Sequence, residues 1–263
     1  MTLTGVRLLL IDAPNMIRRI HAAVPASESQ EKIEQSVSSS LASFKRALRQ
    51  HAPTHVMCAF ESSGTTWRHE VNPDYKKGRP AMPAELREIY AQCIDGLAQE
   101  GITSIRMDGM EADDIIASMA VRAASLDADV TILSTDTGQA QLLSERIRQY
   151  DHFRDEPISP DRIRKRYAVE PRQLIDYYAL VGDSSHSLSG VAGIGAKTAA
   201  KLLADYADLE AILQDRDNIG GRIGENLDRY AETARQTRLL VSLKTDLRID
   251  HSLKDFRYQP AEG

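Results

Sequence analysis

The sequence of 263 residues predicts an α/β fold with a mostly parallel sheet flanked by helices. Short apolar runs of strand length alternate with longer amphipathic segments, which is the pattern of parallel α/β sheets. Several of these runs are apolar throughout, as strands buried on both faces are. A hydrophobic content of 42% is sufficient for a sizeable core. In such sheets ligands bind beyond the carboxyl ends of the strands, so the residues that follow each strand are the candidate functional positions.

Four strands are expected in the first half of the chain, separated by helices. The expected strands are Val6–Ile11, His55–Phe60, Ile102–Met107 and Asp129–Leu133. Apolar residues spaced by three or four predict the helices Asn15–Ala23, Lys32–Gln50, Pro83–Glu100 and Glu111–Ala124. Residues 26–31 and 62–83 are polar and lack this period, so we expect irregular connections there.

The second half of the chain is expected to be helical. A Ser-Pro pair at Ser159 begins an arginine-rich segment, which is typical of a helix start. The expected helices are Ser159–Tyr167, Pro171–Val181, Ala196–Leu203, Leu209–Leu213, Glu225–Tyr230 and Ala231–Leu240. We therefore divide the chain into an α/β core at residues 1–156 and a helical region at residues 157–258.

The overall charge and the cysteine content limit the classes of function. A net charge of −5 and a pI of about 5.8 weigh against a general nucleic-acid-binding protein, because such domains are usually basic. Any basic surface must therefore be local. Cys58 and Cys93 have apolar neighbours and no CxxC motif, so we expect buried thiols in a reducing compartment. With no secretory start and no apolar run of about 18 residues in the sequence, we expect a cytoplasmic monomer without a membrane partner.

Acidic residues follow all four expected strands. They are Asp12, Glu61, the group Glu111-Ala112-Asp113-Asp114, and Asp136. A single acid after a strand is unremarkable, because aspartate caps helices and a helix N-terminus stabilises an acid by about 0.3 to 1 kcal/mol. Four in succession, with no lysine or arginine between them at the strand ends, would repel one another. They therefore predict a bound cation, and an all-oxygen site suits Mg²⁺ or Mn²⁺.

A glycine-rich turn precedes a helix of small residues in the second half. In the run Gly193-Ile194-Gly195, bare backbone amides at a helix N-terminus could approach a phosphate, and Lys197 and Lys201 would neutralise its charge. Such a contact reads no base sequence. An ordinary helix–helix turn is the alternative. The carbonyl groups of the turn, with those of Leu180 and Val181 at the end of the preceding helix, could jointly hold a monovalent cation.

The long connection 62–83 is basic in an otherwise acidic protein. Its four cations and two acids leave a net charge of +2: Arg68, Lys76, Lys77 and Arg79 against Glu70 and Asp74. Trp67 and Tyr75 offer ring faces on which unpaired bases could stack. A solvated loop is the ordinary alternative, but structureless loops longer than about 12 to 15 residues are usually functional or disordered. We interpret the segment as a mobile, basic gateway over the acidic residues.

These motifs occur together in a recognisable order. They are Asp12, Phe60-Glu61, Arg68, Tyr75-Lys76, Arg79, Glu111-Ala112-Asp113-Asp114, Thr135-Asp136, Gly182-Asp183-Ser184-Ser185 and the run GVAGIGAKTAAKLL. The pattern covers nearly the whole chain and resembles the 5′-nuclease, or flap endonuclease, family, most of all the exonuclease IX group of bacterial stand-alone flap endonucleases. The resemblance implies a PIN-like core, a helical arch at about residues 62–83 and a helix-3-turn-helix that grips duplex DNA.

The resemblance also implies metal ligands. For a first divalent ion they would be Asp12, Glu61, Glu111, Asp113 and, through a water, Asp114. Gly138 and His186 stand where the family has aspartates. A second ion would therefore keep only Asp136 and Asp183, and we expect this site to be weak. A K⁺ ion would be held by the main-chain oxygens of Leu180, Val181, Ser189, Val191 and Ile194.

The contacts to DNA are implied in the same way. They would come from Arg68, Tyr75, Gly193, Ile194, Gly195, Ala196, Lys197, Thr198 and Lys201. Lys76 and Arg79 would stabilise the charge that develops on the reacting phosphate.

The expected function is that of a Mg²⁺-dependent, structure-specific nuclease. It would hydrolyse a DNA phosphodiester near the junction of a 5′ flap and duplex, as a 5′ flap endonuclease or 5′-3′ exonuclease. The alternative from a different class is a DNA flap or junction-binding protein with residual or no catalysis. A small-molecule phosphatase would account for the acids but not for the glycine-rich turn or the basic connection, so we rank it last.

Overall fold

The computed structural model describes residues 3, 5–25 and 29–259. A six-stranded sheet has the order β3-β2-β1-β4-β5-β6, and all neighbours pair in parallel except β5 and β6. The strands are β1 (Arg7–Asp12), β2 (His55–Ala59), β3 (Thr103–Ile105), β4 (Asp129–Leu133), β5 (Ile147–Asp151) and β6 (Glu156–Pro157). The predicted α/β fold with a mostly parallel sheet is confirmed.

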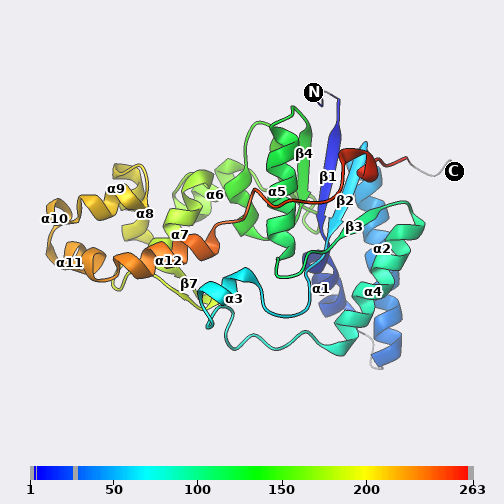
Figure 1. The fold of residues 1–263 in the computed structure, drawn as a ribbon, viewed down its shortest axis with the longest axis horizontal. Helices are drawn as coiled ribbons and strands as arrows, with labels where there is room; N and C mark the ends of the chain where they lie inside the picture. Colours follow the sequence, from blue (N-terminus) through cyan, green and yellow to red (C-terminus); the bar gives the residue numbers. More distant parts are fainter. Residues whose placement is uncertain (1–2, 4, 26–28, 260–263) are drawn as a thin grey trace.

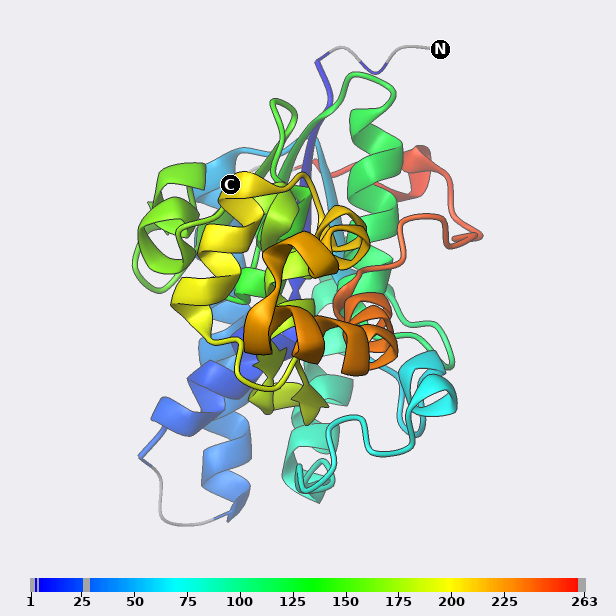
Figure 2. The ribbon, with the colours of Figure 1, turned by 90° about the vertical axis from the view of Figure 1, so that its left-hand side faces the viewer.

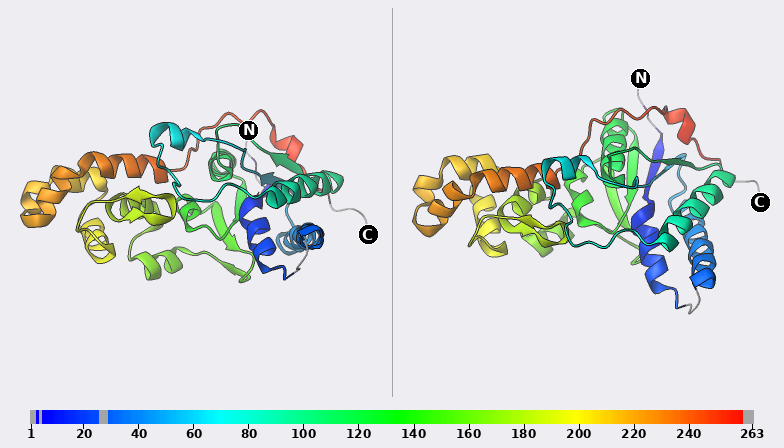
Figure 3. Two further views of the ribbon diagram at one scale, coloured as in Figure 1. Left: turned by 90° about the horizontal axis from the view of Figure 1, so that it is seen from below. Right: turned by 60° about the horizontal axis from the view of Figure 1, so that its bottom comes forward.

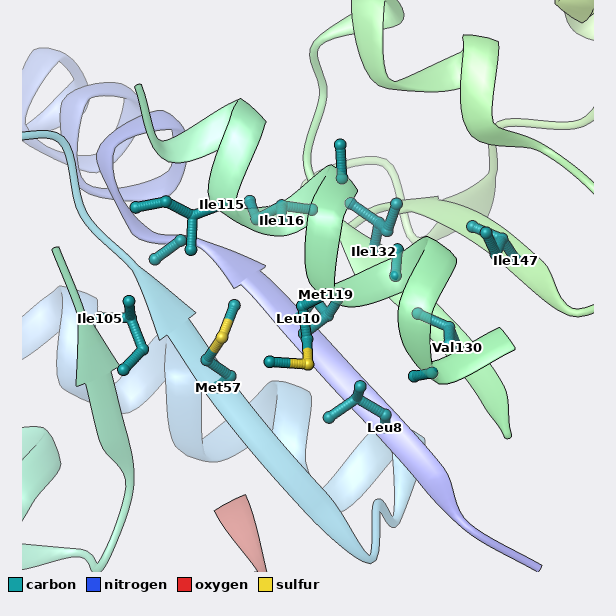
Figure 4. Close-up of a cluster of buried hydrophobic side chains, with 14 of the residues drawn as sticks. Leu8, Leu10, Met57, Ile105, Ile115, Ile116, Met119, Val130, Ile132 and Ile147 are labelled. Atoms are coloured by element: carbon teal, nitrogen blue, oxygen red, sulfur yellow. The ribbon is translucent and has the colours of Figure 1, made fainter. Parts of the chain in front are cut away.

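Helices cover both faces of the sheet (Figure 1). Alternate residues of β1 are buried on opposite faces, Leu8 and Leu10 on one and Leu9 and Ile11 on the other. The first face packs against α5 (Ala112–Ala124), and the apolar cluster between them is shown in Figure 4. The second face packs against α1 (Ala13–Ala23), α2 (Ser29–His51) and α4 (Ala84–Gln99). Cys58 and Cys93 are free thiols buried in this second layer.

Two features of the α/β core differ from the sequence prediction. The irregular connection predicted at residues 26–31 extends too far, because α2 already begins at Ser29. Residues 26–28 lie outside the described residues. Strand β5 was not expected, because the residues that it buries include Gln149 and Asp151, so its sequence lacks an apolar pattern.

The helical region extends from one end of the sheet, and its helices α8 to α11 lie farthest from the strands (Figures 1 and 2). Its helices are α6 (Pro160–Tyr167), α7 (Leu174–Val181), α8 (Ala196–Asp205), α9 (Leu209–Gln214), α10 (Arg216–Ile219), α11 (Gly221–Arg229) and α12 (Ala231–Val241). A two-stranded hairpin, β7 (Gly182–Asp183) and β8 (Leu188–Ser189), follows α7. Short 3₁₀ turns are η1 (Thr137–Leu142), η2 (Pro171–Gln173), η3 (Ser184–His186) and η4 (Leu253–Phe256).

Residues 62–83, which we call the arch segment, connect β2 with α4 and pass beside the helical region (Figure 3). The segment is not wholly irregular, because it contains the short helix α3 (Trp67–Val71). Tyr75 packs with Leu188 and Leu240 in a small apolar cluster, which joins the arch segment to β8 and α12. Within the described ranges, no helix is both long and apolar enough to cross a lipid bilayer.

Candidate active site

Three acidic side chains meet at the carboxyl edge of the sheet. Asp12 ends β1, Asp136 follows β4, and Asp113 lies in the first turn of α5. β1 and β4 are neighbours at the point where the strand order changes direction, which is where open α/β sheets bind ligands. The three acids line one cavity of about 480 Å³, which is also lined by Lys76, Arg79 and His186.

Polar side chains hold this edge of the sheet in place. Ser134 Oγ donates a hydrogen bond of 2.7 Å to Asp12 Oδ2. Asn15 Oδ1 accepts hydrogen bonds from the backbone and the hydroxyl of Thr135, so the ends of β1 and β4 are tied together. Gln139 Nε2 donates to Asp113 Oδ1 over 2.6 Å. Sequence reasoning did not identify Asn15, Ser134 or Gln139 as site residues, and their only signal is that they lie within three residues of Asp12 or Asp136.

The protein does not neutralise these three acids. Among the described residues, none of the three takes part in a salt bridge. Burial raises the pKa of Asp12 to about 6, against the opposing hydrogen bond from Ser134. Burial also raises the pKa of Asp113 well above its ordinary value, and the charges of Asp12 and Asp136 add to this shift. A cation from solution would relieve the repulsion among them.

Glu61 and Glu111, by contrast, are paired with cations of the chain itself. Arg18 of α1 forms a salt bridge with Glu61. Lys76 Nζ donates to Glu111 Oε1 over 2.8 Å, and Arg68 lies 3.4 Å from the other oxygen of Glu111. The expectation that no lysine or arginine lies among the strand-end acids is therefore wrong. The cations come from α1 and from the arch segment, which are not adjacent in sequence to the acids that they neutralise.

Asp114, which is predicted to reach the ion through a water, has its carboxylate engaged by the protein itself. Its side chain is fully buried, and both of its oxygens accept hydrogen bonds from Arg68. Trp67 Nε1 and the backbone N–H of Lys244 donate to the same carboxylate. Four hydrogen bonds leave this carboxylate in a structural role between α5, the arch segment and the chain that follows α12.

Arg68 and Tyr75, which are predicted to contact DNA, are likewise engaged inside the protein. Arg68 is 2% exposed and donates to Asp114 and to the carbonyl oxygen of Leu240. Tyr75 is 4% exposed, and its hydroxyl donates to Glu111 over 3.2 Å. Their side chains support the arch segment from inside and offer no free face to a base. Lys76 is half-buried at the cavity and Arg79 is exposed there.

Asp183 lies near the same cavity but has its own partners. His186 Nδ1 lies 2.6 Å from Asp183 Oδ2, and Ser185 donates to the other oxygen. Burial alone would raise the pKa of Asp183, but the hydrogen bonds from His186 and Ser185 lower it to about 2. Gly138 has no side chain to offer an ion, and its backbone N–H donates to Asp136 Oδ1 over 2.8 Å.

The donor chemistry at the sheet edge fits a hard divalent ion. Asp12, Asp113 and Asp136 offer carboxylate oxygens without a competing cation, and oxygen is the donor that Mg²⁺ and Mn²⁺ prefer. Gln139 Oε1 is buried beside them and has no hydrogen-bond partner in the described part of the chain. No three His, Cys, Asp or Glu side chains of the described ranges already surround one point closely enough to hold an ion.

The glycine-rich turn lies at the N-terminus of α8. Gly195 is the N-cap of this helix, and Gly193 has φ +78, in the left-handed region that favours glycine. Asn226 Nδ2 of α11 supports the turn by donating to the carbonyl of Ala192. Gly193, Gly195, Ala196, Lys197 and Lys201 are exposed, Thr198 is half-buried, and Ile194 is buried beneath them.

The backbone that carries the carbonyl groups predicted to hold K⁺ comes together beside the β7–β8 hairpin. A Cβ atom added at Gly190, directly after β8, would lie 2.4 Å from the oxygen of Leu180 at the end of α7. The oxygens of Leu180, Ser189 and Val191 accept hydrogen bonds from Val191 N, Thr237 Oγ1 and Ile194 N respectively. A carbonyl oxygen has a second lone pair, so these groups can still coordinate a cation.

Two family models match this chain in succession. The model of the 5′-3′ exonuclease N-terminal resolvase-like domain matches residues 7–168, and the model of the 5′-3′ exonuclease C-terminal SAM fold matches residues 169–263. The chain belongs to the 5′-3′ exonuclease family. The family resemblance that the motifs indicated is confirmed.

Relatives match this 5′-3′ exonuclease family member over almost its full length. "Flap endonuclease Xni" of Shewanella pealeana is 37% identical over 257 residues, which are 98% of this chain and 99% of the relative. "Flap endonuclease Xni" of Photobacterium profundum is 37% identical over 255 residues, 96% of this chain and 97% of the relative.

Solved structures share the fold of this family member at lower sequence identity. The zinc-bound T5 5′-exonuclease has a TM-score of 0.77 and 20% identity, covering 91% of this chain and 90% of that one. The catalytic core of Rad2 in complex with DNA substrate has a TM-score of 0.61 and 15% identity, covering 98% of this chain and 83% of that one.

Proposed function

We propose that this member of the 5′-3′ exonuclease family hydrolyses DNA phosphodiesters at the junction of a 5′ flap and duplex. The observation that carries the proposal is the set of three acids without cationic partners, Asp12, Asp113 and Asp136, in one cavity with Lys76 and Arg79. Membership of the family and the names of the full-length relatives support the same activity. An acidic cavity with basic residues at its rim suits a reaction on a phosphate that needs a metal ion.

Asp12, Asp113 and Asp136 would hold Mg²⁺, and Mn²⁺ could replace it. The ion would supply a Lewis acid for the scissile phosphate and would lower the pKa of the attacking water. Gln139 orients Asp113, and Ser134 orients Asp12, so the chain fixes the direction of the donor oxygens. Glu61 and Glu111 would join the ligand set only by releasing Arg18 and Lys76. Arg79, which is exposed at the rim, would stabilise charge on the phosphate.

The duplex would be held at the N-terminus of α8. The exposed backbone of Gly193 and Gly195 and the side chains of Lys197 and Lys201 are suited to phosphates and read no base sequence. K⁺ bound by the carbonyl oxygens around the β7–β8 hairpin would fix the shape of this turn. We further propose that the protein acts as a monomer in the cytoplasm, where the buried thiols of Cys58 and Cys93 stay reduced.

The test is cleavage of a 5′-labelled flap DNA in Mg²⁺ and then in Mn²⁺. We expect a product cut near the flap junction, no product with a chelator, and a loss of at least about 100-fold in rate for Asp113→Asn. Glu145→Gln, a change to an exposed acid on another part of the surface, is the matched control and should cleave normally. Undiminished cleavage by Asp113→Asn would rule out the proposed site.

A junction-binding protein with little catalysis is the second candidate. Gly138 and His186 favour it, because neither offers a carboxylate at the positions where the resemblance implies one. Binding of the flap without any product at stoichiometric protein, in both metals, would support this candidate over the nuclease.

A further inference from the structure

The turn that contains His186 contacts residues 75–77, which we call the base of the arch segment, in three ways. The rings of His186 and Tyr75 stack, with centroids 5.5 Å apart and planes 2° from parallel. The backbone N–H of Lys76 donates to His186 O over 2.8 Å. Ser187 Oγ donates to the carbonyl oxygen of Lys77 over 3.0 Å. We call these three contacts the clasp.

Hydrogen bonds hold the His186 turn on the helical side of the clasp. Asp183 holds the His186 ring through Nδ1 and also accepts two hydrogen bonds from Ser185, so the turn is fastened to the end of β7. The backbone after β8 packs closely on α7 and β7, because a Cβ atom added at Gly190 would lie 2.4 Å from backbone atoms of both. His186 is therefore presented to the arch segment from a turn that is anchored by these contacts.

On the arch side, the clasp helps to maintain the backbone conformation of Lys76. Lys76 has φ +55, a backbone conformation that side-chain-bearing residues adopt at a cost, so contacts from outside must maintain it. The hydrogen bond from Lys76 N to His186 supplies one such contact. The backbone N–H of Arg79 in turn donates to Lys76 O over 3.0 Å. A shift of this turn would therefore move Lys76 and Arg79 together.

The clasp thus acts on the two cations that the arch segment contributes to the cavity lined by Asp12, Asp113 and Asp136, which we call the carboxylate cavity. Lys76 Nζ reaches Glu111 from the same turn and lies 5.0 Å from the centre of the Tyr75 ring. Tyr75, stacked on His186, also donates its hydroxyl to Glu111. His186 is consequently connected to the rim of the cavity both through the backbone of Lys76 and through the ring of Tyr75.

We propose that His186 is a positioning residue, which clasps the base of the arch segment and thereby holds Lys76 and Arg79 over the carboxylate cavity. The inference rests on the proposed nuclease function, in which these cations face the reacting phosphate. It also assigns Asp183 to the clasp, because its carboxylate is occupied by His186 and Ser185.

The first test is the single-turnover rate of 5′-flap cleavage with enzyme in excess. A displacement of about 1 Å in a positioned group can cost about 100-fold in rate, so we expect His186→Ala to lose about 10- to 100-fold with unchanged affinity for the flap DNA. His186→Phe keeps a ring for the stack on Tyr75 and should recover part of the loss. Ser184→Ala, which removes an exposed hydroxyl of the same turn, is the control and should cleave normally.

A combined-variant comparison separates positioning from a general structural defect. If His186 acts through Lys76 and Arg79, adding His186→Ala to a variant that carries both Lys76→Ala and Arg79→Ala should slow cleavage by no more than about threefold further. Full multiplication of the two losses would overturn the proposal, as would a wild-type rate in His186→Ala or in the variant that carries both Lys76→Ala and Arg79→Ala.

The clasp can also be tested without catalysis. Trp67 is the single tryptophan of the chain and packs in the same apolar cluster as Tyr75. We expect acrylamide to quench its fluorescence at least about twofold more readily in His186→Ala than in Ser184→Ala, because the arch segment loosens. Equal quenching in the two variants would overturn the clasp. If the wild-type protein cut no flap DNA, the proposed function would fail, and this measurement would still decide whether the clasp exists.

Discussion

Arg68 and Asp114 form a two-pronged salt bridge in the interior, with N–O distances of 2.6 and 2.8 Å between residues 46 positions apart. Arg68, which is 2% exposed, also donates to the carbonyl oxygens of Leu240 and Ser242. The pair therefore joins the arch segment, α5 and the end of α12 at one point. Asp113, the residue directly before Asp114, lies at the cavity and has no salt-bridge partner among the described residues.

Asp114→Asn should destabilise the fold without removing the metal site. The variant leaves the Arg68 guanidinium buried with one of its two acids neutralised, and breaking a buried pair in this way costs about 3 to 5 kcal/mol. Denaturant unfolding measures the loss. Asp161→Asn, which alters an exposed salt bridge with Arg164, is the control and should change the free energy of unfolding by less than about 1 kcal/mol. Wild-type stability combined with lost Mn²⁺ binding would show that Asp114 is a ligand after all.

Gly190→Ala should disrupt the β7–β8 hairpin. The added Cβ would lie 2.4 Å from Gly182 N and Leu180 O, and backbone cannot withdraw as a flexible side chain can. Overpacking of this kind costs about 1 to 3 kcal/mol or more, and a lower melting temperature would report it. Gly195→Ala is the comparison for stability: nothing lies within 4 Å of its added Cβ, so its only expected cost is that alanine is a poorer N-cap of α8 than glycine, and its melting temperature should fall by less than that of Gly190→Ala. Equal melting temperatures for the two variants would contradict the packing described here.

Acidification should weaken the fold through His152. Burial, and next the charge of Arg46, lowers the pKa of His152 from 6.5 to about 4. Between these values the unfolded chain binds a proton that the folded protein refuses, so the free energy of unfolding falls as the pH falls below about 6.5.

The contribution of His152 can be isolated by comparing the wild type with His152→Gln. Between about pH 7 and pH 5 the wild type should lose about 1 kcal/mol more than the variant, after allowance for solvent screening. Chemical unfolding at the two pH values provides the measurement. Parallel losses in both proteins would exclude His152 as the source.

Lys197→Ala and Lys201→Ala should weaken DNA binding in a salt-dependent way. Each lysine is exposed beside the glycine-rich turn, and each lost phosphate contact reduces the slope of log K against log salt by about 0.9. Fluorescence anisotropy of a labelled flap at several salt concentrations measures the slope. The cleavage rate at saturating protein should not change, because these lysines contact the duplex and not the reacting phosphate. A wild-type slope in the double variant would place the duplex elsewhere.

The sequence predicts the sheet and the convergence of Asp12, Asp113 and Asp136, because parallel strands bring their carboxyl ends to one edge. The residues of the acidic run 111–114 do not by themselves show which role Asp113 and Asp114 each have, since two adjacent aspartates in the first turn of α5 differ only in the direction in which their side chains point. Their different roles are decided by Arg68, which is distant in sequence and reaches Asp114 only after the arch segment has folded against α5.

The roles of the aromatic residues in the arch segment depend in the same way on tertiary contacts. Trp67 and Tyr75 are typical of base-stacking residues when they are considered alone. In the fold, the Trp67 indole donates to Asp114 and the Tyr75 ring lies against His186. Both partners are more than 40 residues away, so composition and spacing within the segment could not reveal them.

A Mn²⁺ titration of the wild type, Asp113→Asn and Asp114→Asn tests most directly whether Asp113, and not Asp114, holds the metal ion. Binding is measured as the loss of the electron paramagnetic resonance signal of free Mn²⁺. The account predicts that the wild type binds Mn²⁺, that Asp114→Asn retains binding while it remains folded, and that Asp113→Asn loses at least about tenfold in affinity. Binding by Asp113→Asn that equals the wild type, or no binding by the wild type, would contradict it.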